Sequence, residues 1–293
     1  MLAVIAGQGA LPGVVARAQP TSPLICSLVG NDPADLSVDL RFRVEHLGSF
    51  LADLTTRGVR EVCFCGRIDR PAVDPTQIDA QTAPMVPTLA AAVAGGEDKA
   101  LRAIVTLFEE AGLVVVGAAT LTPDLLPAQG CPTRMPAPPA TESDVAVALN
   151  VLGDQARADV GQACVIRDRI VIAREETAGT DAMLDGLGAT TLADDPFGAA
   201  MDVVGNVLDT AADWLSGSEN APPASPRRGI LFKAPKPGQD RRVDLPTIGP
   251  GTVARAAQAG LEGIVIEEGG VMVLDLAEVI ADLDARGMFL WVR

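Results

Sequence analysis

Short apolar runs alternate with helix-like segments over the first 120 residues, and this alternation restricts the chain to few folds. Four runs have the length and composition of buried strands, at residues 2–7, 24–29, 62–66 and 113–118. Between them, residues 47–58 and 97–112 carry apolar side chains at helical spacing, and each ends at a glycine. Strands that alternate with helices form mostly parallel sheets covered on both faces. The pattern predicts a Rossmann-like α/β domain over residues 1–121.

A proline-rich stretch divides the chain. Residues 122–143 contain six prolines, which interrupt helices and central strands, so we predict a linker there. The elements expected after it are a helix at about 144–158, a hairpin turning at Arg167 and Asp168, a helix after GTDAML (179–184), an alanine-rich helix near 198–215, a polar loop at 216–226, strands at 229–234, 263–268, 271–275 and 288–292, and helices at 252–260 and 276–287. Residues 144–293 are therefore predicted to form a second α/β domain with a mixed sheet.

Charge and hydropathy exclude several classes of protein. The net charge of −15 argues against binding a nucleic-acid backbone. No apolar stretch approaches the roughly 20 residues that a membrane-spanning helix needs. The first residues, MLAVIAGQGALP, lack the basic segment of a signal peptide, so we expect a cytoplasmic protein.

Cysteine and histidine usage narrows the chemistry. Cys63 and Cys65 occupy one face of a predicted strand, where they form either a metal or redox pair or, as we favour, small buried apolar residues. His46 is the single histidine, so zinc sites built from histidines are excluded. Any metal is expected to be a hard cation held by carboxylate oxygens.

The first candidate site is the glycine turn at residues 7–12, GQGALP, between a strand and a helix. Free N–H groups at a helix start favour an anion. The turn lacks the third glycine of a dinucleotide fingerprint, and Asp32 only roughly meets the requirement for an acidic residue about 20 positions on. A tight turn without a ligand is an equally good interpretation.

The second candidate is a basic segment. Residues 227–242 contain six lysines and arginines and the single acid Asp240, in a chain that is otherwise acidic. Prolines around Lys233 and Lys236 stiffen the loop, which lowers the entropy cost of positioning the two ammonium groups. The segment indicates binding of a phosphate, and the alternative is a solvated basic loop.

Three further positions carry polar groups near predicted strand ends. Asp244 follows the basic segment, and its carboxylate is suited to holding Mg²⁺ or orienting water, or else to anchoring a helix entry. Residues 175–181, EETAGTD, offer Thr180 and Asp181 to a ligand or as a helix N-cap. Gln162 precedes a strand and either contacts a ligand or lies in a turn.

Five sequence blocks together resemble one enzyme family. They are AGQGALP, CGRIDRP, VGQACVI, EETAGTDAML and KAPKPGQDRRVDLPTIGP. Their order and spacing resemble the UDP-2,3-diacylglucosamine pyrophosphatase family of the LpxI type, which acts in lipid A synthesis, and the resemblance covers nearly the whole chain. It implies two α/β domains with the ligand cleft between them.

The resemblance also implies a reaction and its site. The reaction would be Mg²⁺-dependent hydrolysis of UDP-2,3-diacylglucosamine to UMP and 2,3-diacylglucosamine 1-phosphate (lipid X). The essential aspartate, and the Mg²⁺ ligand, would be Asp244. Substrate would be bound by Ala10, Leu11, Pro12, Gly66, Gln162, Thr180, Asp181, Lys233 and Lys236. We expect transient contact with the inner membrane face and no nucleic-acid partner. Whether the protein forms a homodimer is left open.

Two departures and two alternatives accompany this interpretation. The segment 185–226 looks longer and more acidic than usual for the family, and Arg67 stands where a small polar residue such as asparagine is expected. One alternative is a non-catalytic nucleotide-sugar or lipid-binding protein with the same cleft. The other is a dinucleotide-dependent oxidoreductase, which the imperfect glycine turn disfavours.

Overall fold

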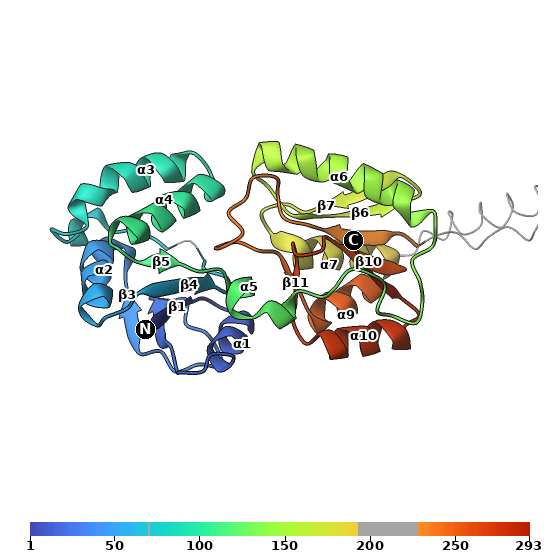
Figure 1. Ribbon diagram of the computed structural model, residues 1–293. Coiled ribbons are helices and arrows are strands. Elements are labelled where there is room, and N and C mark those ends of the chain that lie inside the picture. Colours follow the sequence, from blue (N-terminus) through green and yellow to red (C-terminus); the bar gives the residue numbers. More distant parts are fainter. Residues whose placement is uncertain (70, 193–227) are drawn as a thin grey trace, which may run out of the picture.

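The described residues form two α/β halves, each built around its own sheet (Figure 1). The computed structural model describes residues 1–69, 71–192 and 228–293. The alanine-rich helix expected near 198–215 and the polar loop at 216–226 lie outside the described residues. No helix in the described ranges is long and apolar enough to cross a membrane.

The N-terminal half contains a parallel sheet of five strands in the order β3-β2-β1-β4-β5. The strands are β1 (Leu2–Ala6), β2 (Leu24–Leu28), β3 (Leu40–Phe42), β4 (Glu61–Cys65) and β5 (Val114–Val115). All four predicted strands are present, and β3 is an addition that the sequence analysis did not identify.

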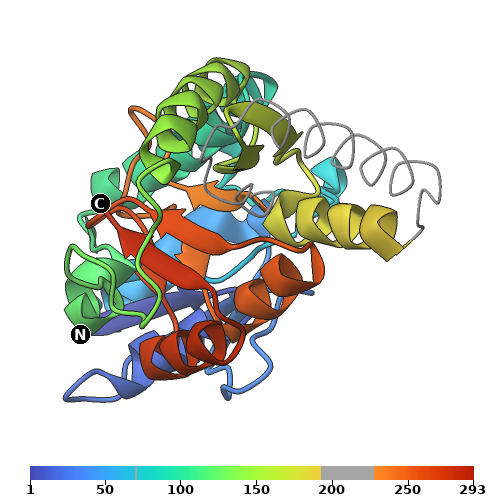
Figure 2. The same ribbon diagram turned by 90° about the vertical axis from the view of Figure 1, so that its right-hand side faces the viewer.

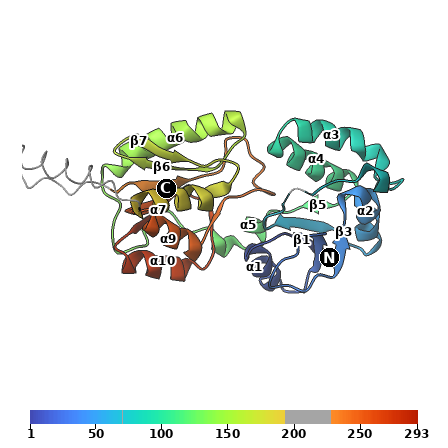
Figure 3. The ribbon, with the colours of Figure 1, turned by 180° about the vertical axis from the view of Figure 1, so that it is seen from behind.

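Helices cover both faces of this sheet. They are α1 (Leu11–Arg17), α2 (Leu47–Thr56), α3 (Val86–Ala94), α4 (Glu97–Glu110) and α5 (Ala118–Leu121). In α2, Leu47, Phe50, Leu51 and Leu54 recur at helical spacing and are buried with α4 against one face of the sheet. The other face packs against α1 and α5, and α5 lies between the two halves in both views (Figures 1 and 3).

The segment between the halves packs on the C-terminal one. Gly130 pairs with Val292 at the end of the chain, and the Thr133 hydroxyl accepts a hydrogen bond from the backbone of Leu290 (3.1 Å). The helix α6 (Thr141–Ala158) then begins three residues before its predicted start.

The C-terminal half contains a mixed sheet of five strands in the order β12-β10-β8-β6-β7. The strands are β6 (Ala163–Arg167), β7 (Ile170–Arg174), β8 (Ile230–Lys233), β10 (Gly263–Ile266) and β12 (Phe289–Val292), with a separate parallel pair β9 (Thr247–Ile248) and β11 (Met272–Val273). The predicted hairpin is confirmed, because β6 and β7 pair antiparallel, and its turn, Asp168 and Arg169, lies one residue later than predicted. Both turn residues have positive φ (49° and 65°), as a two-residue hairpin turn requires.

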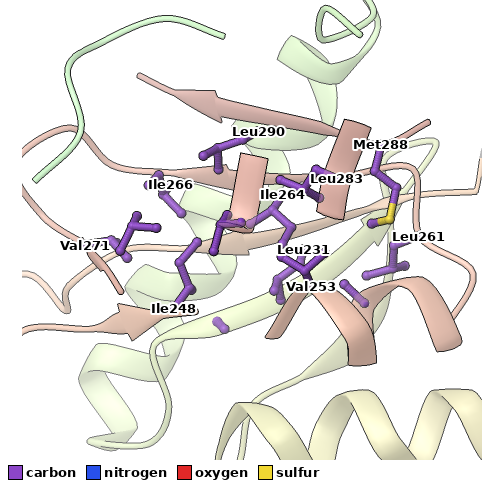
Figure 4. Close-up of a cluster of buried hydrophobic side chains, with 14 of the residues drawn as sticks. Leu231, Ile248, Val253, Leu261, Ile264, Ile266, Val271, Leu283, Met288 and Leu290 are labelled. Atoms are coloured by element: carbon purple, nitrogen blue, oxygen red, sulfur yellow. The ribbon is translucent and has the colours of Figure 1, made fainter. Parts of the chain in front are cut away.

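Residues of this sheet alternate between two apolar clusters. One cluster joins the sheet to α6; the other joins it to α7 (Gly179–Leu192), α9 (Pro250–Gln258) and α10 (Leu276–Ala285). In β8, for example, Ile230 and Phe232 belong to the cluster with α6, whereas Leu231 belongs to the other cluster (Figure 4). Figure 2 shows the strands of this sheet between α6, in green, and the red helices α9 and α10. The mixed α/β sheet predicted for this half is therefore present. Its central strand β8 ends at Lys233.

Candidate active site

The loop that follows β8 reaches across to the N-terminal half (Figure 1). It runs from residue 234 to residue 246, just before β9. Arg102 of α4 donates a hydrogen bond to the Gly238 carbonyl (2.5 Å), and Arg242 of the loop pairs with Glu109 of α4 (2.7 Å). The most basic part of the sequence thus lies where the two halves meet.

Asp244 is held at this junction by two amide side chains. Gln162, just before β6, donates to Asp244 Oδ2 (2.8 Å). Gln239 donates to the same oxygen and to the Asp244 carbonyl (2.6 Å), while its own Oε1 accepts the backbone N–H of Lys236 (2.8 Å). Within the described ranges Oδ1 makes no hydrogen bond, so one carboxylate oxygen is fixed and the other is available.

The surroundings of Asp244 disfavour the charged form of its carboxylate. Burial raises its pKa above the ordinary aspartate value, and the nearby charge of Asp98 raises it further. Lys236, Lys233 and the Gln162 amide oppose this shift without cancelling it. A cation or a proton donor that arrives with a ligand would therefore stabilise the buried Asp244 carboxylate.

Lys233 is the last residue of β8, and its side chain is buried, with 8% of the residue exposed. Its ammonium donates to the Thr180 hydroxyl (2.8 Å) at the start of α7. Burial lowers the pKa of Lys233, and Glu175, Asp181 and Asp244 act against that shift. Lys233 is therefore a buried charge that depends on surrounding carboxylates.

Lys236 bridges the two halves. Its ammonium lies 2.5 Å from Asp159 at the end of α6 and 3.2 Å from Asp98 at the start of α4. Burial lowers the pKa of Lys236, but these two carboxylates outweigh burial and the pKa is raised overall. No sequence pattern marks Asp98 or Asp159, since each pairs with a residue far away along the chain.

Much of the charge in the basic segment is already paired. Arg241 contacts Glu267 (2.6 Å), and Arg242 contacts Asp240 (2.7 Å) as well as Glu109. Arg67, a departure from the family pattern, pairs with Asp69 (3.3 Å) and donates to Gln8 Oε1 (3.1 Å), with its side chain 74% exposed. The cations available to a ligand are thus fewer than the sequence suggests.

The glycine turn is braced by the neighbouring strand end. The backbones of Gln8 and Arg67 exchange two hydrogen bonds (2.7 and 2.9 Å). A Cβ on Gly7 would lie 2.4 Å from the Arg67 carbonyl oxygen, and Gly66 has a φ of +87° with Pro12 packed against it. These glycines are required where the two backbone segments cross closely, whether or not a ligand binds.

Two cavities meet at Asp244. The smaller, about 390 Å³, is bounded by the glycine turn, the start of α1 and Arg241 and Arg242. The larger, about 980 Å³, extends over α3 and α4. Their walls share Phe64, Cys65, Gly66, Arg67, Val243 and Asp244.

The structure brings most of the predicted site residues to this junction. Ala10, Leu11 and Gly66 line the smaller cavity, whereas Pro12 is buried behind it. Lys236 lines the larger cavity. Gln162, Thr180 and Lys233 line neither cavity: Gln162 donates to Asp244, and Lys233 donates to Thr180.

Other highlighted residues lie elsewhere. Asp181 is exposed and pairs with Arg255 (3.5 Å), and Asp32 pairs with Arg41 (2.6 Å). His46 is exposed and contacts the Gln77 carbonyl (3.1 Å). Cys63 and Cys65 are buried in the apolar cluster beneath α1, and the contact with Cys63, together with burial, raises the pKa of Cys65.

The donor set suits Mg²⁺ only together with a ligand. In the part of the chain that the structure describes, no three His, Cys, Asp or Glu side chains converge as a preformed metal site. Mg²⁺ is commonly held by one or two carboxylates with substrate phosphates and water. Asp244, with Oδ1 available, fits that arrangement.

Two family models match the chain. The family model for the LpxI N-terminal domain matches residues 1–125, and that for the LpxI C-terminal domain matches residues 128–291. The chain belongs to the LpxI family. The predicted family is confirmed, and with it the prediction that the chain is a hydrolase.

One curated LpxI relative matches nearly end to end. It is the UDP-2,3-diacylglucosamine pyrophosphatase LpxI of Caulobacter vibrioides, 33% identical over 293 aligned residues. The match covers 98% of this chain and 95% of the relative, so both LpxI domains and the loop carrying Asp244 lie within it.

Proposed function

We propose that this LpxI-family protein hydrolyses UDP-2,3-diacylglucosamine to UMP and 2,3-diacylglucosamine 1-phosphate, lipid X. The observation that carries the proposal is the position of Asp244 at the meeting point of the two cavities. A nucleotide linked to a diacylated sugar is polar at one end and apolar at the other, with the diphosphate between. Arg241 and Arg242 border the smaller cavity, whereas the apolar side chains of α3 border the larger one.

The smaller cavity would take the uridine end. The strand order β3-β2-β1-β4-β5, with helices on both faces, supports a Rossmann-like nucleotide-binding half. Ala10 and Leu11 open α1 at this cavity, and Arg241 and Arg242 lie opposite. Arg67 stands at the junction, within reach of both cavities, and would meet the diphosphate.

The larger cavity would take the acyl chains. Its wall contains apolar side chains that the protein leaves partly uncovered, including Ile68 (39% exposed), Val73 (50%) and Val93 (43%). The helix α3, which is rich in valine, leucine and alanine, has no buried residue although it lines this cavity. An apolar ligand would cover these side chains and gain about 25 cal/mol per Å² of apolar surface removed from water.

Charge neutralisation would drive the reaction. A diphosphate repels an incoming water, so catalysis needs cations around phosphorus more than a protein nucleophile. Asp244 Oδ1 would hold Mg²⁺ together with phosphate oxygens, and bound Mg²⁺ would neutralise charge on the diphosphate. Lys233 and Lys236 would add positive potential from beneath and beside Asp244, and water would attack the sugar-side phosphorus with UMP leaving.

The substrate class also suggests a location. A diacylated sugar nucleotide partitions to a membrane surface, so we propose a cytoplasmic protein that contacts the inner membrane face transiently. The apolar rim of the larger cavity supports this, because it is where acyl chains would enter.

Release of UMP tests the proposal. The protein is incubated with UDP-2,3-diacylglucosamine with and without Mg²⁺, and UMP and substrate binding are both measured. Metal-dependent UMP release is expected. Binding without release would instead support the non-catalytic lipid- or nucleotide-sugar-binding alternative, and neither binding nor release would refute both.

A further inference from the structure

The Glu175 carboxylate accepts hydrogen bonds on both of its oxygens. It follows β7, and its backbone N–H donates to the Ala163 carbonyl (3.0 Å). Oε2 accepts the backbone N–H of Gln162 (2.8 Å), and Oε1 accepts the hydroxyl of Thr180 (2.9 Å). One carboxylate therefore holds two residues of the site.

The two hydrogen bonds lead to the junction by separate routes. Glu175 holds the backbone of Gln162, and the side-chain amide of Gln162 donates a hydrogen bond to Asp244 Oδ2 (2.8 Å). Thr180 gives its hydroxyl proton to Glu175, so the lone pairs of its oxygen face outward and accept Lys233 Nζ (2.8 Å). Glu175 thus fixes the direction of the second bond as well as its position.

We propose that Glu175 is a positioning residue for phosphate hydrolysis, holding Lys233 charged through Thr180 and holding Asp244 in place through Gln162. The inference rests on the proposed function, and Glu175 itself lines neither cavity.

A carboxylate is needed here because Lys233 is almost fully buried. Three carboxylates face its ammonium, those of Glu175, Asp181 and Asp244, together with the neutral Thr180 hydroxyl. Asp181 is 61% exposed at its side chain and engages Arg255, and Asp244 is itself held by two amides. Glu175 opposes the effect of burial most strongly, since it is tied to Lys233 through a single hydroxyl.

The first test is Glu175→Gln, which keeps the shape and removes the charge. Removing such a supporting group is expected to lower kcat about 10- to 100-fold, with KM changed less than kcat. Glu176→Gln is the matched control, because Glu176 is exposed and adjacent. The control is expected to keep wild-type kinetics, and a Glu175→Gln variant with wild-type kcat would overturn the proposal.

The second test asks whether turnover depends on the relay, meaning the hydrogen bonds from Lys233 through the Thr180 hydroxyl to Glu175, or only on packing of the Thr180 side chain. Thr180→Ser keeps the hydroxyl, whereas Thr180→Val keeps the shape and loses it. Turnover is expected to survive in the serine variant and to fall in the valine variant. Equal activity of the two variants would overturn the route from Glu175 to Lys233.

A third measurement does not depend on turnover. In protein labelled with ¹³C at lysine Cε, the NMR titration of Lys233 is followed in wild type, Thr180→Val and Glu175→Gln. Loss of the relay is expected to move the Lys233 titration to lower pH, and an unchanged titration in either folded variant would overturn the proposal. If the wild type releases no UMP, the proposed function fails, while this titration still decides the relay.

Discussion

At the scale of single residues, the site combines buried carboxylates with buried cations that the sequence separates widely. Asp244, Lys233 and Gln162 were all identified from short motifs, because strand ends and a basic segment mark them. Their partners Glu175 and Gln239 were passed over, since a glutamate or glutamine in a polar turn carries no distinguishing pattern. Hydrogen bonding in three dimensions, rather than composition, sets them apart.

Replacing Asp244 by asparagine is expected to maintain or raise stability at pH 7. Burial raises the pKa of Asp244, so its charged form is disfavoured in the fold relative to the unfolded chain. The native state then loses stability as pH rises from the ordinary aspartate pKa through the raised one, and the asparagine variant lacks that loss. Thermal unfolding without divalent cations measures this, and a Tm at pH 7 clearly below wild type would contradict it.

Glu45 is expected to change stability with pH in the opposite direction to Asp244. Its side chain is 3% exposed, contacts Arg43 (3.1 Å) and accepts the backbone N–H of Asp74 (2.9 Å); these contacts lower its pKa to about 2. A lowered pKa adds stability above the ordinary value of 4.5, and that stability is lost as pH falls toward 2. In urea unfolding, the deficit of Glu45→Gln should shrink as pH falls through this range; a pH-independent deficit would refute the assignment.

At the scale of elements, periodicity identified the long and well-packed pieces and missed the short or exposed ones. The strand β3 has only three residues, too few for any alternation. The helix α3 has a proline in its first turn and buries no side chain, so its sequence lacks an amphipathic pattern. The ion pairs that join α4 to the loop after β8 were also invisible, because they depend on how the halves meet.

The crossing of the glycine turn with the end of β4 gives an element-scale prediction. Gly66→Ala is expected to destabilise the protein by about 1–3 kcal/mol, because a Cβ would lie 2.8 Å from Gln8 O and from Pro12 at a φ of +87°. Gly58→Ala is the control, since its φ is +79° with no atom within 4 Å of the added Cβ, and it should cost about 1 kcal/mol. Urea unfolding compares them, and equal losses would mean that the close crossing adds no constraint.

At the scale of the whole molecule, the loop after β8 ties the halves together around the ligand cavities. Fold class and the family were both predictable, because sequence blocks spread along both halves carry them. The resemblance implies a cleft between the domains, but the residues that form the cavity walls could not be predicted, since the walls combine residues more than a hundred positions apart.

The two cross-half ion pairs are expected to differ in strength. Lys236 is 6% exposed at its side chain, so Asp98→Asn should cost about 1–3 kcal/mol, less than a full buried pair because Asp159 remains. Glu109 and Arg242 are 46% and 45% exposed, and Glu109→Gln should cost under about 1 kcal/mol. Denaturant unfolding of the two variants measures the difference, and the reverse order would contradict this assignment of the junction.

The most direct test of the central claim is UMP release by wild type and Asp244→Asn in H₂¹⁸O with Mg²⁺. Wild type is expected to release UMP and to place ¹⁸O in the phosphate of lipid X. The variant should bind substrate and lose at least about 100-fold in rate, as for loss of a group that acts on the transition state. Wild-type rates in the folded variant, or ¹⁸O in UMP, would contradict the account.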